Sequence, residues 1–201
     1  MMGPTRCQVL LAILMTSATL LAGEGSAAVP DWVRPGMSLT YEGMTASIQD
    51  GQPVSGMQMV MTTTVDRAAE NSVSGSTRVD IPNAPTYGWT YNWTAVEGES
   101  WRDVHRFWVD PKDPTASVRG PEGEELSVVG QEIYEREGKT WQATIMAARS
   151  QGAEVSLTYE TESGLILAYA EKRSSQHLSI FLGSAGMAAD GTANEQMQVP
   201  D

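Results

Sequence analysis

Four aromatic residues alternate with small or polar residues between positions 87 and 94: Tyr87, Trp89, Tyr91 and Trp93. Because successive side chains of a β-strand point to opposite faces, all four rings are predicted to share one face. Indole and phenol rings stack on sugars and pack against acyl chains, so the stripe is a candidate binding surface for a carbohydrate or an apolar, lipid-like ligand. The alternative is that the rings belong to the core, which alternation on a half-buried strand also indicates.

A run of alternating methionines is the second candidate site. Met57, Met59 and Met61 are expected on one face of a strand, with successive Cα atoms roughly 6.6 Å apart. Thioether sulfurs are soft ligands that suit copper(I), so the run could hold that metal. Methionine also fills irregular gaps in a core, and this alternative stays open. No other cofactor is indicated.

The two histidines, His105 and His177, belong to no recognisable catalytic or zinc motif. The chain has no H-E-x-x-H, no H-x-H and no cysteine pair, and the segment 183–186 only approaches the nucleophile elbow of hydrolases. Glycine-rich phosphate loops are absent as well. The sequence therefore favours a non-enzymatic binding protein over an enzyme.

Strand-length segments recur along the chain without a long helical period, which predicts an all-β fold. We expect a single antiparallel β half-barrel or sandwich, with the aromatic stripe in the middle of the sheet. Gly43 is expected to interrupt the first strand as a bulge or bend. The predicted strands are 37–48, 57–65, 72–81, 87–94, 115–119, 125–134, 140–148, 155–159, 165–171 and 177–182.

The segment 101–109 is compatible with two structures. Ser100 and Asp103 could form a helical capping box, whereas the concentration of Trp, Val and Phe favours a strand. We expect a strand that completes an aromatic hairpin with residues 87–94. Trp101 and Trp108 are therefore added to the candidate ligand-binding residues.

The first 28 residues have the features of a secretory signal peptide. Arg6 precedes an apolar run over 9–22 that is too short for a comfortable membrane span. Small residues at 26–28 then predict cleavage before Val29. The mature protein is expected to be periplasmic or secreted, with a β domain over 29–186 and a flexible tail over 187–201. Cleavage also removes Cys7, the only cysteine, so disulfide and thiolate chemistry are excluded.

Acidic residues dominate the charge of the chain. The formal net charge is −12, and it is unchanged by cleavage because the signal peptide contains one base and one acid. Nucleic acids and anionic membrane surfaces attract basic patches, so neither is an expected partner. After Val29 no apolar run is long enough to span a membrane. The expected partner is an apolar or carbohydrate ligand, or an envelope protein.

In the segment 155–169, a polar turn containing Gly164 joins an alternating strand to a Leu-rich one. This pattern resembles a hairpin found in periplasmic half-barrel proteins, including those of the lipoprotein-carrier type. The resemblance implies a wide, curved sheet that holds an apolar ligand, and it favours the half-barrel over the closed sandwich. We therefore predict an exported, non-enzymatic β-protein with an aromatic-lined binding face. The alternatives are a copper(I)-binding protein and a structural protein-interaction module.

Overall fold

The computed structural model describes residues 29–50, 52–70, 72–96, 107–120, 123–150 and 152–187. The predicted signal peptide and residues 188–201 of the predicted tail lie outside these ranges. The described strands are β1 (Met37–Gln49), β2 (Gln52–Ala69), β3 (Ser72–Asp80), β4 (Trp89–Val96), β5 (Ser127–Arg136), β6 (Lys139–Arg149), β7 (Ala153–Glu160), β8 (Ile166–Arg173) and β9 (Gln176–Met187).

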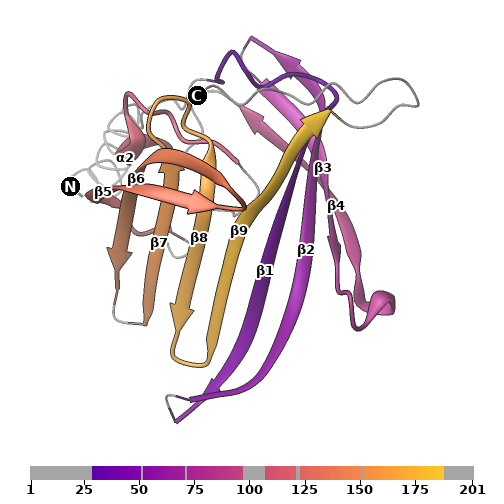
Figure 1. Cartoon of the computed structure of the whole chain (residues 1–201), viewed down its shortest axis with the longest axis vertical. Coiled ribbons are helices and arrows are strands. Elements are labelled where there is room, and N and C mark those ends of the chain that lie inside the picture. The colour runs from indigo at the N-terminus through magenta and orange to yellow at the C-terminus, as the bar shows by residue number, and fades with distance from the viewer. Residues whose placement is uncertain are drawn as a thin grey trace, which may run out of the picture.

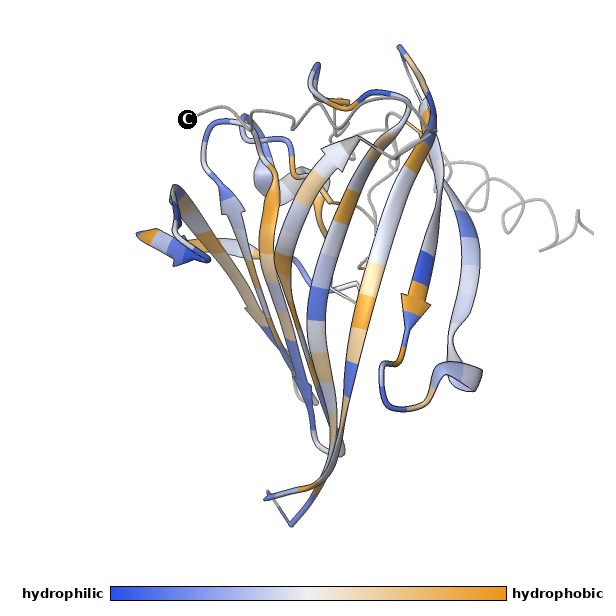
Figure 2. Cartoon of the chain, turned by 45° about the vertical axis from the view of Figure 1, so that its right-hand side comes forward, coloured by the Kyte–Doolittle hydropathy of each residue, from blue (hydrophilic) through white to orange (hydrophobic). Residues whose placement is uncertain are grey.

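These nine strands form one antiparallel sheet in the order β4-β3-β2-β1-β9-β8-β7-β6-β5. The all-β prediction is confirmed, and the sheet is single and open, as a half-barrel requires and a sandwich does not. The first and last strands pair at its centre, with Met37 opposite Met187. β1 and β2 extend beyond the other strands at the lower end of Figure 1. In Figure 2, hydrophobic and hydrophilic bands alternate along the strands, as expected when each strand buries one face.

Two local predictions were wrong. The segment predicted as a strand over 115–119 contains a short helix, α2 (Pro114–Ser117). Pro114 fixes φ at the first helical position, and Ser117 Oγ donates a hydrogen bond of 3.0 Å back to the carbonyl of Pro114. Gly43 does not interrupt β1. A Cβ at this position would lie 2.5 Å from the carbonyl oxygen of Ser179, so the glycine allows β9 to approach closely.

We call the face of the sheet that carries the hydrophobic core the inner face. Its buried residues include Leu39 and Tyr41 on β1, Met61 on β2, Leu157 on β7 and Leu182 on β9. The Tyr41 hydroxyl donates a hydrogen bond of 3.0 Å to the carbonyl of Ile166. This bond links strands that are far apart in the sequence across the core.

Part of the connection from β4 to β5 lies against the inner face. Phe107, Trp108 and Val109, which we call the strap, are all at most 2% exposed. Trp108 forms a single antiparallel bridge to Leu165. The Val109 amide donates to the Gly164 carbonyl at 2.8 Å, and the Ile166 amide donates to the Phe107 carbonyl at 2.9 Å. The strap is thereby joined to the turn between β7 and β8.

The hairpin of β5 and β6 bends over the opposite, outer face. The Arg136 guanidinium lies 5.1 Å from the ring centroid of Phe181 on β9. Its Nη2 donates a hydrogen bond of 3.2 Å to Glu42 on β1. Figure 1 shows the hairpin crossing in front of the neighbouring strands. The two faces of the sheet therefore carry different structures, the strap on the inner face and this hairpin on the outer one.

Candidate functional site

The aromatic stripe is largely formed as predicted, but it lies on an edge strand and not in the middle of the sheet. Trp89, Tyr91 and Trp93 pair with Val79, Thr77 and Gly75 of β3 and share the inner face. Tyr87 does not belong to the strand. It ends the 3₁₀ turn η1 (Pro85–Tyr87), and its side chain is 72% exposed. The proline at the start of this turn disfavours a ladder, so the strand begins only at Trp89.

Trp93 packs at the margin of the core. Its ring lies over Gly75, where a Cβ would come within 2.6 Å of the indole. The ring of Phe107 in the strap meets it edge to face, with centroids 5.9 Å apart. Trp93 is half-buried by these contacts. It therefore serves mainly to hold the strap against β4.

Trp89 lies four residues before Trp93 on β4, and 49% of it is exposed. Its row across the sheet continues through Val79 and Met61, both buried. In the adjoining rows, Met59 and Leu178 are half-buried against the core, while Met57 is 43% exposed. We call the residues Trp89, Met57, Met59 and Leu178 the inner-face patch. All four border the core on the inner face, with the buried Val79 and Met61 between Trp89 and the three residues on β2 and β9.

The predicted methionine face is present on β2. Met57, Met59 and Met61 pair with Thr45, Gly43 and Tyr41 of β1, so all three point to the inner face. Met61 is only 6% exposed and belongs to the core. In the described part of the chain, His, Cys, Asp and Glu form no group of three that could hold a metal. The copper(I) site stays a prediction.

The strand predicted for 101–109 is not formed at its described end. Residues 107–109 make only the isolated bridge of Trp108 to Leu165. Trp108 is 1% exposed, so this candidate ligand-binding residue is a core residue in the structure. Trp101 and His105 lie outside the described residues.

A polar cluster borders the inner-face patch and was not predicted. The Tyr169 hydroxyl donates a hydrogen bond of 3.0 Å to Glu171, and the Arg173 guanidinium donates to the other oxygen of the same carboxylate. Burial, reinforced by the neighbouring carboxylate, raises the pKa of Tyr169. Glu171 pairs directly with Leu178 of the patch. The apolar surface therefore ends in charged and hydroxyl groups at β8.

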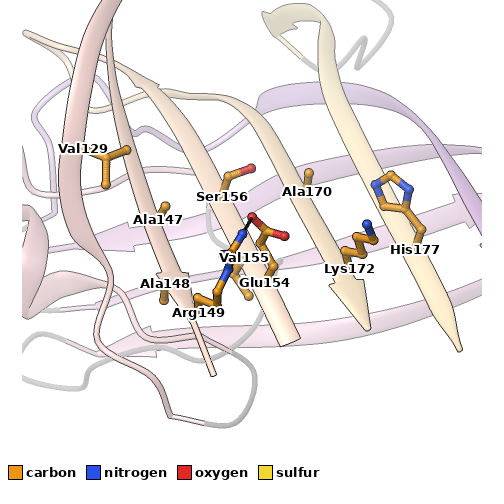
Figure 3. A pocket seen from close by; sticks show the side chains of 10 residues that line it. All are labelled: Val129, Ala147, Ala148, Arg149, Glu154, Val155, Ser156, Ala170, Lys172 and His177. Carbon is orange, nitrogen blue, oxygen red and sulfur yellow. Dashed lines mark hydrogen bonds and ion pairs between the residues drawn. The ribbon is translucent and has the colours of Figure 1, made fainter. Parts of the chain in front are cut away.

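The outer face contains a hollow of about 550 Å³ that the sequence also did not reveal. Figure 3 shows its lining side chains. Ala147, Ser156 and Ala170 form one row across β6, β7 and β8. The next row holds charged or titratable side chains, and Val129 stands at one end. The full lining is Val129, Ala147, Ala148, Arg149, Glu154, Val155, Ser156, Ala170, Lys172 and His177. Which residues meet in such rows depends on strand register, which composition and spacing do not supply.

Comparisons with known proteins add little to this description. No family model and no curated protein matches the chain. Among solved structures, a domain named as an outer membrane lipoprotein-sorting protein from Vibrio parahaemolyticus aligns with 91% of this chain and 93% of its own. The sequence identity is 10% and the TM-score is 0.28, and a score this low does not establish a common arrangement of the strands. No helix within the described ranges is long and apolar enough to cross a membrane.

Proposed function

We propose that this protein binds an apolar, acyl-chain-like ligand on the inner-face patch, as an exported protein of the periplasm or the extracellular space. The half-exposed indole of Trp89, on the same face of the sheet as the exposed Met57, is the observation that carries the proposal. Large apolar side chains that remain exposed beside a completed core are typical of binding surfaces. No catalytic step is part of this function.

The residues around Trp89 favour an acyl chain over a sugar. A sugar platform needs polar side chains beside the ring to bind the hydroxyl groups. On the inner face Trp89 lies opposite Val79, with Met61 beyond it on β2 and Met59 in the next row, and the one hydroxyl-bearing side chain beside it on β4 is Tyr91. Thioether side chains adapt their shape to flexible apolar ligands. The polar cluster of Tyr169, Glu171 and Arg173 lies where a ligand's polar end would leave the patch.

Titration of the protein with a dansyl-labelled fatty acid tests the proposal, with maltohexaose as the sugar probe. The exposed half of the Trp89 ring offers about 120 Å² to a ligand, since a tryptophan can bury up to about 250 Å². At about 25 cal/mol per Å², this contact contributes at most about 3 kcal/mol. We therefore expect Trp89→Ala to weaken binding of the fatty acid by between about ten- and one-hundred-fold.

Met44→Ala is the matched control, because Met44 is also 49% exposed but points to the outer face of β1. It is expected to leave the affinity unchanged. Tight binding of maltohexaose instead of the fatty acid would refute the acyl-chain assignment. Equal losses in the two variants would refute the inner-face location.

Met57→Leu separates the apolar site from a copper(I) site. Leucine keeps the apolar surface and removes the thioether sulfur. Fatty-acid binding is therefore expected to persist in this variant, whereas copper(I) binding through Met57 would weaken.

A further inference from the structure

We propose that the outer-face hollow binds a small organic anion, consisting of a carboxylate or phosphate group on a short apolar body. Lys172 and His177 would contact the anionic group, and the row of small residues with Val129 would hold the apolar body. This site lies on the opposite face from the inner-face patch and does not depend on the function proposed for that patch.

The shape of the hollow follows from three neighbouring rows of side chains. Its floor is the small-residue row, in which Ser156 lies between Ala147 and Ala170. The row on one side carries the bulky Phe181, over which Arg136 stacks. The row on the other side carries the long charged side chains. Small residues in the floor, with Phe181 on one side and the long charged side chains on the other, leave a depression, and about 550 Å³ is enough for a small molecule.

The charged row runs directly across four strands. Arg149 pairs with Glu154, Glu154 with Lys172, and Lys172 with His177. Side chains of directly opposed residues share a face, so all four point into or beside the hollow. Figure 3 shows them along one side of it.

The charges in this row are not balanced within it. Glu154 accepts a hydrogen bond of 2.7 Å from Arg149, which neutralises that pair. The pKa of Glu154 is lowered chiefly by this bond and to a smaller extent by the charge of Lys172. Lys172 forms no ion pair within the described residues, and His177 beside it supplies a ring N–H donor.

An excess of positive charge at this place is notable because the whole chain has a net charge of −12. Lysine and histidine donors next to an apolar floor suit an oxyanion that carries an apolar group. Arg149 and Glu154 would define the border of the site, since their charges already compensate one another.

Backbone-amide NMR titration with phenyl phosphate and with phenylacetate tests the proposal, and benzyl alcohol is the uncharged probe. We expect shifts centred on Ala147, Ser156 and Ala170 with either anion, and the tighter ligand identifies the head group. Absence of binding by both anions, or equal binding of benzyl alcohol, would overturn the proposal.

Three exposed-site variants test the charge argument. Lys172→Gln is expected to weaken anion binding by about two- to five-fold, the range for an exposed charge pair. Glu154→Gln is expected to strengthen it, because it removes a nearby negative charge and frees Arg149. Lys139→Gln, at the exposed start of β6, is the matched control and is expected to change nothing. Weaker binding in Glu154→Gln, or equal losses in the two lysine variants, would rule out the assigned contacts.

Discussion

Gly164→Ala is expected to detach the strap from the turn between β7 and β8. Gly164 has a φ of +75°, and a Cβ at this position would lie 1.9 Å from the Val109 carbonyl oxygen. The Gly164 carbonyl also accepts the hydrogen bond from the Val109 amide. An alanine cannot fit here unless the strap moves away.

Two contributions determine the size of the effect. A non-glycine residue in the left-handed region costs about 1–2 kcal/mol. Displacement of the strap also breaks the bonds from Val109 to Gly164 and from Ile166 to Phe107, each worth about 0.5–1.5 kcal/mol. The expected loss in the free energy of unfolding is therefore about 2–5 kcal/mol, before any loss of packing around Trp108.

Urea denaturation of the two proteins measures this loss, and hydrogen exchange at the Val109 and Ile166 amides reports the strap directly. Gly138→Ala is the control, because Gly138 has a φ of +78° but no atom within 4 Å of the added Cβ. Its free energy of unfolding should fall only by the cost of a non-glycine residue in the left-handed region, about 1–2 kcal/mol. If the free energy of unfolding falls no further in Gly164→Ala than in this control, and the Val109 amide stays protected from hydrogen exchange, the assigned attachment of the strap is wrong.

Two other substitutions test the core. Gly75→Ala would place a Cβ 2.1 Å from the Thr64 carbonyl oxygen and 2.6 Å from Trp93, so urea denaturation should show a loss of about 1–3 kcal/mol. Gly130→Ala, with open space around its Cβ, should show none. Tyr41→Phe loses a buried hydrogen bond, about 1 kcal/mol at neutral pH. Burial raises the pKa of Tyr41, so its folded-state contribution is complete below about pH 10, where the unfolded tyrosine ionises, and declines above it. The difference in the free energy of unfolding between wild type and Tyr41→Phe should accordingly narrow from pH 8 to pH 11. A constant difference would contradict this account.

The strands that alternate most clearly were predictable from the sequence. In 57–65 and 72–81 most alternate positions are apolar, with Thr63, Gly75 and Thr77 as the exceptions, because one face of β2 and of β3 lies largely on the core. The ends of the strands were less predictable. β2 continues to Ala69 through polar residues, since ladder hydrogen bonds extend a strand beyond its buried part.

The features that depend on distant contacts were not predictable. Trp108 looked like a ligand-binding strand residue, but its burial depends on Leu165, which lies far along the chain. The edge position of β4 follows from the pairing of β1 with β9, which local patterns do not encode. The same holds for the outer-face hollow, whose rows exist only once four strands are in register.

The pairing of the first strand with the last also has a consequence for how the chain folds. β1 to β4 form one meander and β5 to β9 form another, and the β1–β9 ladder joins them. Until β9 has been synthesised, the edge of β1 that faces away from β2 has no partner strand. Closing so long a loop has a high entropic cost, which slows folding. The order of the strands thus keeps the nascent chain from joining the two halves of its sheet until β9 is available.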